Sequence, residues 1–109
     1  MELLDKDGVS VREISLDGTT AVGITLDMPG TGKSILEIHC NKGLLLCGVF
    51  NPEVLESFGT AVVIISAPNL DVMLENHPKA MTAAAREMGV TEEMTGREIA
   101  LLFSKQQLA

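Results

Sequence analysis

Aromatic side chains are almost absent from this sequence: three phenylalanines occur among 109 residues, and tryptophan and tyrosine do not occur at all. Proteins that read single-stranded nucleic acids stack the bases on aromatic rings, and this chain cannot build such a platform. Basic residues are also scarce, because eight Lys and Arg stand against fifteen Asp and Glu, which gives a formal net charge of −7. A chain with this balance repels phosphate polymers and anionic membrane surfaces. We therefore expect neither a nucleic acid nor a membrane as a partner.

Cysteine is limited to Cys40 and Cys47, which is too few for a disulfide framework. With His39 and His77 as the histidines, the spacing matches no zinc motif, and we expect neither a metal nor another cofactor. The longest apolar run is Ala61–Ile65, far short of the roughly 18 residues that a membrane helix needs. The amino-terminal residues are acidic and do not resemble a secretory signal. We therefore expect a cytoplasmic protein with reduced thiols.

In the first half of the chain, apolar and polar residues alternate as they do in half-buried strands. Two such segments, 9–16 and 21–26, flank Asp17–Gly18, a pair that is typical of a tight hairpin turn. Segment 35–40 alternates in the same way, segment 44–49 is a nearly continuous apolar strand, and the two predict a second hairpin.

The second half of the chain is dominated by helix signals. Asn51–Pro52 is a favourable helix start, because Asn can cap a free amide and Pro has no amide to leave unpaired, and Gly59 would end this helix. Segment 60–66 is rich in β-branched residues without polar alternation, as expected for a central strand covered on both faces. Three further helices are predicted: 70–75 after Asn69, 78–89 opened by Pro78, and one that begins at the capping box Thr95–Glu98.

The expected order is therefore four strands, a helix, a strand and three helices, within one domain that spans residues 1–109. With 46% hydrophobic residues, a chain of this length can bury a core without a metal or a disulfide. This order predicts an α+β fold, with a mostly antiparallel sheet of about five strands and the helices packed on one face.

Two segments carry a resemblance to a known family. In one, Lys42–Gly43 is followed by Cys47–Gly48; in the other, Met88–Gly89 precedes Met94–Ile99, which reads MTGREI. The pattern resembles the YunC-like family of small bacterial and archaeal domains of unknown function, and the match covers most of the chain. The resemblance implies an α+β fold with a largely antiparallel sheet in a stand-alone protein. It implies no established activity and supplies no catalytic residues.

The second hairpin decides the surroundings of the two cysteines. A three-residue loop, Asn41–Gly43, would pair Cys40 with the first residue of the next strand. Counting back from this pair puts Cys47 across from Glu37 and diagonal to His39, on the face opposite Cys40. A Cys40–Cys47 disulfide is then excluded, and Cys40 belongs to the core. A thiol beside a possible base is allowed by this geometry, although the neighbouring carboxylate disfavours the reactive thiolate.

Two predicted strands lead directly into capped helices. Segment 44–49 leads into Asn51, and segment 60–66 leads into Asn69. If the connection between these strands is a crossover, they are parallel and their carboxyl ends meet at one sheet edge, where ligands gather and free helix amides favour negative charge. The alternative is that both asparagines only cap their helices. The candidate ligand-binding residues are Cys47, Gly48, Asn51, Ser66 and Asn69.

The leading interpretation is a non-catalytic binding module for a small anionic metabolite or a protein partner. The alternative is a small thiol-dependent enzyme that uses Cys47 with His39. Gly32–Ser34 suggests a nucleotide phosphate loop, but Asp27 stands where that motif requires its first glycine, and a strand rather than a helix is predicted after Ser34. The segment 28–33 is better interpreted as a Gly/Pro-rich connector.

The last helix predicts self-association. On a helical wheel, Ile99, Leu102 and Phe103 lie on one side, while Leu101 and Leu108 lie on nearly the opposite side. One domain core can cover only the first line, so the second line favours a homodimer or a higher homo-oligomer. The alternative is that Leu101 is simply half exposed at the surface.

Overall fold

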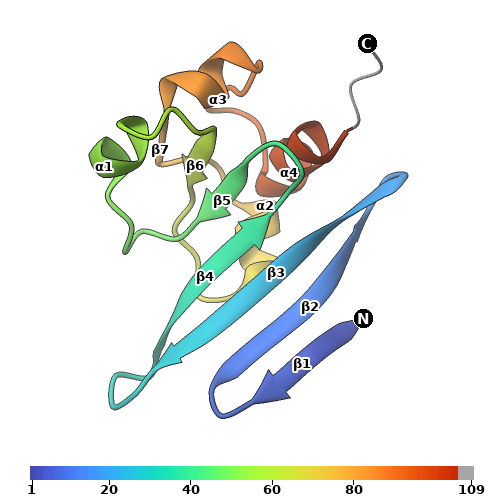
Figure 1. Cartoon of the computed structure of the whole chain (residues 1–109), viewed down its shortest axis with the longest axis vertical. Helices are drawn as coiled ribbons and strands as arrows, with labels where there is room; N and C mark the ends of the chain where they lie inside the picture. The colour runs from blue at the N-terminus through green and yellow to red at the C-terminus, as the bar shows by residue number, and fades with distance from the viewer. Residues whose placement is uncertain (106–109) are drawn as a thin grey trace.

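Seven strands form one sheet in the computed structural model, which describes residues 1–105, and they lie in the sheet in chain order (Figure 1). Neighbouring strands are antiparallel except for β5 and β6, which are parallel. This confirms the α+β class and the mostly antiparallel sheet, with the first and last strands added to the five that were predicted. The strands are β1 (Glu2–Lys6), β2 (Val9–Leu16), β3 (Thr19–Met28), β4 (Lys33–His39), β5 (Leu44–Leu46), β6 (Val62–Ile64) and β7 (Ala80–Met81).

Asp–Gly pairs make the first two turns of the sheet. The turn at Asp17–Gly18 joins β2 to β3 as predicted, and Gly18 has a φ of 79°. The strand β1 was not predicted, although Asp7–Gly8 joins it to β2 through another two-residue turn, in which both residues have positive φ, 53° and 80°. A two-residue hairpin turn of this kind needs left-handed backbone, which Asp and Gly tolerate best. All five residues of β1 are exposed, so this strand forms an open edge of the sheet.

The register between β4 and β5 differs by one residue from the predicted one. His39 pairs with Leu44, and the Cys40 amide donates to the Gly43 carbonyl over 3.0 Å, so the loop is only Asn41–Lys42. The prediction that paired Cys40 with Leu44 is therefore wrong. A one-residue shift moves every side chain of a strand to the other face of the sheet, and it changes the neighbours of Cys47.

Packing of Gly43 explains this difference. Gly43 is not among the glycines with positive φ, so it does not act as the turn glycine that a three-residue loop would need. A Cβ atom at this position would lie 2.5 Å from Cδ2 of Phe103, closer than real contacts allow. Gly43 is thus required where the ring of the last helix packs against the sheet, which is a tertiary contact that local turn chemistry does not contain.

Four helices follow or interrupt the second half of the sheet: α1 (Pro52–Glu56), α2 (Leu70–Glu75), α3 (Ala83–Glu87) and α4 (Gly96–Ser104). Their N-caps include the predicted Asn51, Asn69 and Thr95, the last within a complete capping box. The predicted helix start at Pro78 is wrong. Residues 80–81 instead pair with β6, and Thr82 caps α3 through its side chain.

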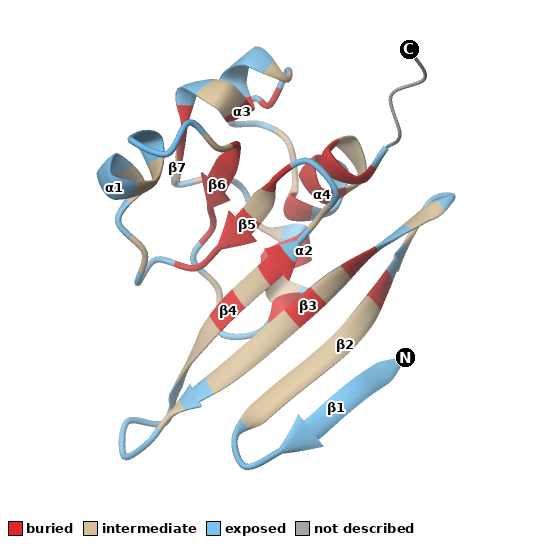
Figure 2. Cartoon of the chain, viewed as in Figure 1, coloured by how far each residue is buried: buried red, intermediate tan, exposed pale blue. Residues whose placement is uncertain are grey.

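The main core lies between the sheet and the helices α2, α3 and α4, and the buried residues gather there in Figure 2. The strands contribute every second residue to this core, the ones on the face toward these helices, such as Ile38, Leu45 and Val63. The helix α1 is an exception to the prediction that all helices pack on one face. Its Leu55 packs against the opposite face, on Val62 and neighbouring residues of β5 and β6.

The last helix follows its predicted stripe in part. Ile99 and Phe103 are fully buried, and Leu102 packs partly against the core. Leu101 is half-buried, and Leu108 lies outside the described residues. Within residues 1–105, no helix is both long and apolar enough to cross a membrane.

Candidate functional site

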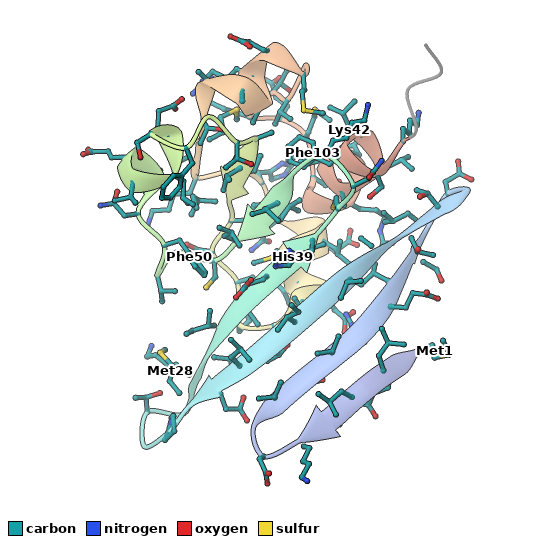
Figure 3. All side chains as sticks on the ribbon, viewed as in Figure 1. Met1, Met28, His39, Lys42, Phe50 and Phe103 are labelled. Carbon is teal, nitrogen blue, oxygen red and sulfur yellow. The ribbon has the colours of Figure 1, made fainter. Side chains whose placement is uncertain are left out.

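A cavity of about 390 Å³ opens where the carboxyl ends of β5 and β6 meet the amino end of β4. In Figure 3, Met28 marks its wall at the end of β3. Ten residues from four segments line the cavity: Met28, Gly32, Lys33, Ser34, Cys47, Gly48, Val49, Ser66, Ala67 and Pro68.

The parallel pairing of β5 with β6 brings Cys47, Gly48 and Ser66 into this cavity. Leu46 pairs with Ile64, so the residues that follow the two strands leave the sheet side by side. A Cβ atom on Gly48 would lie 3.2 Å from the Ser66 hydroxyl oxygen, so the two segments are in close contact there. Three of the five predicted site residues therefore share one cavity at the expected edge of the sheet.

The two asparagines of the predicted site are used as helix caps. The Asn51 side chain accepts from the Glu53 amide over 2.9 Å, and the Asn69 side chain accepts from the Val72 amide over 2.9 Å. Neither asparagine is among the residues that line the cavity.

Lys33 and Ser34 were not among the predicted site residues. Both line the cavity because antiparallel β4 begins where β5 ends. The Ser34 hydroxyl donates to Asp27 Oδ1 over 2.9 Å. Lys33 is exposed, and the ion pairs formed within residues 1–105 do not include it. An exposed ammonium group without a carboxylate partner is the strongest attraction for an anion in this lining.

Cys47 is 5% exposed, and its side chain points to the main core rather than to the face of Glu37. Its sulfur accepts a hydrogen bond from the Leu36 amide over 3.3 Å. His39 lies on the opposite face of β4, where its Nε2 is 2.7 Å from Glu37 Oε1. The predicted position of Cys47 beside Glu37 and His39 is therefore wrong, and the alternative enzyme loses the base on which it depended.

Both cysteines are free thiols. Cys47 lies beside Leu36, while Cys40 is four residues further along β4, roughly 13 Å away at the usual rise of a strand. A disulfide between them is excluded by this separation, and not by the opposite faces that were predicted. Burial raises the pKa of the Cys40 thiol above its ordinary value, and the influence of the Ser104 side chain opposes this effect only in part. Neither thiol has the electropositive surroundings of an activated nucleophile.

Histidine, cysteine and carboxylate groups do not gather into a metal-binding cluster anywhere in the described part of the chain. His77, which follows α2, has its Nδ1 atom 3.1 Å from the carbonyl oxygen of Met94. This contact joins the end of α2 to the segment that precedes α4, so His77 has a structural role there.

Comparison with known proteins agrees with this architecture. The crystal structure of a protein of unknown function, TA1206 from Thermoplasma acidophilum, is similar with a TM-score of 0.81. The two chains are 20% identical, and the similarity covers 93% of this chain and 100% of that one, which shows a shared fold. No curated protein matches the chain.

A family model described as "Domain of unknown function (DUF1805)" matches residues 46–102, which is more than half of the chain. The match includes Cys47–Gly48, which line the cavity. It also includes the whole segment Met94–Ile99 and most of the helix α4. It agrees with the resemblance that these two segments carry in the sequence. The chain belongs to the family of domains of unknown function DUF1805.

Proposed function

We propose that this protein binds a small anionic metabolite in the cavity between β4, β5 and β6. One observation carries the proposal: Lys33, which has no carboxylate partner in the described residues, lines the same cavity as the hydroxyl-bearing Ser34 and Ser66. The cavity also lies outside the carboxyl ends of the parallel strands, which is where ligands gather in folds with such a crossover.

The lining suggests which kind of anion fits. Met28, Val49 and Pro68 supply apolar surface, while Lys33 and Ser66 supply hydrogen-bond donors and the Ser34 hydroxyl already donates to Asp27. A carboxylate on a short carbon skeleton uses both kinds of surface, and a volume of about 390 Å³ suits a small molecule. The net charge of −7 opposes polyanions, so a ligand with one or two charges is favoured.

Binding without catalysis is the better-supported role. Cys47 is held against the wall of the cavity by the Leu36 amide, and His39 faces the other side of the sheet. A nucleophile of this kind needs an adjacent base or a positive group that stabilises the thiolate, and the described geometry supplies neither to Cys47.

Amide chemical shifts measured during titration test the proposal. Inorganic phosphate and succinate are the probes, and the diamide of succinate is the uncharged control. We expect the anions to shift the amides of Ser34, Gly48 and Ser66 together, because these residues line one cavity. Succinate should bind more tightly than phosphate, and the diamide should cause no shift.

Two lysine variants distinguish binding in the cavity from a general effect of the charge of the protein. Lys33→Met should weaken succinate binding at least about tenfold, because it removes the basic group of the lining. Lys42→Met is the matched control, since Lys42 is an exposed lysine in the loop at the other end of β5 and should leave binding unchanged. Shifts centred away from the cavity, or equal affinities for Lys33→Met and wild type, would show that the proposal is wrong.

A further inference from the structure

A second cavity, of about 270 Å³, lies between β2 and the helices α2 and α4. It shares no lining residue with the cavity that Lys33 lines. Figure 3 labels Met1, which is one of the residues around it. Eight residues line this second cavity: Met1, Arg12, Glu13, Ile14, Ser15, Asp71, Leu74 and Arg97.

Two of the three arginines of the chain converge on the second cavity from distant parts of the sequence. Arg12 shares a face of β2 with the core residue Ile14, because residues two apart in a strand point to the same side. Arg97 is the second residue of α4. Glu13 alternates with Arg12, so its carboxylate lies on the other face of the sheet. The lining therefore combines two guanidinium groups with the carboxylate of Asp71.

Arg12 has more hydrogen-bond donors than the chain has acceptors for them. Its Nη2 donates to Asp71 Oδ1 over 2.7 Å, while its Nε is shut off from solvent and has no acceptor among residues 1–105. A guanidinium carries five N–H donors, and a half-buried charge is costly unless its donors are paired. The Asp71 side chain is itself 80% exposed, so water screens this ion pair. An anion in the cavity would supply the acceptors that Arg12 lacks.

Arg97 has no capping role in α4, although it lies within the capping box. Thr95 and Glu98 on either side of it form that box. The Arg97 side chain is half exposed, and its Nη2 is 3.3 Å from Glu75 Oε1, which makes a long and exposed ion pair. A positive charge in the first turn also opposes the helix dipole. The position of Arg97 is thus unfavourable for the helix but suitable for a negatively charged ligand.

We propose that the second cavity binds a phosphate group, free or as a monoester, between Arg12 and Arg97. A guanidinium pairs with phosphate through two parallel N–H···O bonds, and the several oxygens of a phosphate can accept from two guanidiniums at once. A carboxylate has only two oxygens, which a single guanidinium already occupies. The net charge of −7 favours a single phosphate group over a polyphosphate.

Titration with inorganic phosphate tests this proposal, followed by the NMR signals of the arginine Nε–H groups and the backbone amides. We expect the Nε–H signals of Arg12 and Arg97 to shift together with the amide of Asp71, because these residues line one cavity. Glycerol phosphate is the ester probe: whichever of the two binds more tightly identifies the free ion or an ester as the ligand. Succinate should bind here more weakly than phosphate, which is the opposite of the order expected for the first cavity.

Arginine variants locate the binding. Arg97→Gln should raise the dissociation constant for phosphate at least about tenfold, because it removes one of the two guanidiniums. Arg86→Gln is the matched control, since Arg86 is an exposed arginine of α3 that does not line the cavity. Arg12→Lys keeps the charge but loses the planar fork, and it should raise the dissociation constant at least about threefold.

The two cavities are tested separately, because different amides report on each of them. Lys33→Met should leave the phosphate shifts at Asp71 unchanged, and Arg97→Gln should leave the succinate shifts at Ser34 and Ser66 unchanged. Far-ultraviolet circular dichroism checks that every variant is folded. Equal phosphate affinity in Arg97→Gln and wild type, an equal loss in Arg86→Gln, or phosphate shifts confined to the first cavity would overturn the proposal.

Discussion

The contact between α2 and α4 leaves no space for a side chain at Gly96, and the substitution Gly96→Ala tests this packing directly. Gly96 is the first residue of α4, and its amide donates to the Asn76 carbonyl over 2.9 Å. A Cβ atom there would overlap the carbonyl oxygen of Met73 and lie 3.1 Å from the Cα atom of Leu74. Both of these are backbone atoms of α2, so no side-chain rotation can relieve the overlap.

The magnitude follows from two opposing effects. Replacing Gly by Ala within a helix ordinarily stabilises a protein by about 0.5–1 kcal/mol, because the unfolded chain loses freedom. Overpacking against an immovable neighbour costs about 1–3 kcal/mol, and here α4 must also move while carrying the fully buried Ile99 and Phe103. We therefore expect Gly96→Ala to lower the free energy of unfolding by about 2 kcal/mol, or to lower Tm by roughly 10 °C.

Urea unfolding followed by circular dichroism measures this change, with Gly18→Ala as the control. Gly18 has a φ of 79° and no atom within 4 Å of a Cβ, so its substitution costs only backbone strain, about 1 kcal/mol. Gly96 shows no such φ, so its cost comes from contact alone. If Gly96→Ala is as stable as the wild type, or more stable, the close approach of α2 and α4 is incorrect.

Three further outcomes can be measured. Thr82→Val should lower the free energy of unfolding by about 2 kcal/mol, because the Val62 amide loses its buried hydroxyl acceptor, and Thr82→Ser should recover most of this loss. Cys40 should be alkylated more slowly than the unfolded chain at pH 9, since burial raises the pKa of its thiol, and the stability linked to this group should fall as the pH rises above 9.0. Arg97→Ala should change the free energy of unfolding by less than about 1 kcal/mol, because its pair with Glu75 at 3.3 Å is exposed.

Local signals predicted the helix starts well. The side chains of Asn51, Asn69 and Thr95 each accept a hydrogen bond from a backbone amide, which confirms that these residues cap the helices that follow them. The start of α3 was misplaced, because Pro78 is a favourable first helical residue locally, while pairing with β6 draws the next residues into a strand and leaves Thr82 to cap the helix. A long-range pairing therefore outweighed a local preference.

The edge strand β1 could have been found from the sequence. Asp7–Gly8 carries the same turn signal as Asp17–Gly18, and Leu3 and Leu4 precede it. Its acidic residues and its full exposure hide the alternation that marks a half-buried strand. The side of β1–β4 that the helices leave uncovered could not have been predicted in this way, because a pattern of apolar residues does not tell which side of a sheet its helices cover.

The cavity depends on the register of the β4–β5 hairpin, which turn chemistry alone did not predict. With the predicted register, Cys47 would share a face with Glu37 and His39; with the observed one, it lies beside Leu36 on the face that also carries Ser34. The packing of Phe103 on Gly43 is consistent only with the second arrangement, because it removes Gly43 from the turn.

The basic residue of the site nevertheless follows from topology once the parallel pair is accepted. A strand that is antiparallel to β5 must begin where β5 ends, so the first residues of β4 lie beside Gly48 whatever the exact register. Lys33 and Ser34 are those first residues. The same one-residue shift that separates Cys47 from His39 therefore sets it beside Leu36, on the face of β4 that carries Ser34. The thiol loses its predicted base, while Lys33 and Ser34 stay in the lining of the cavity.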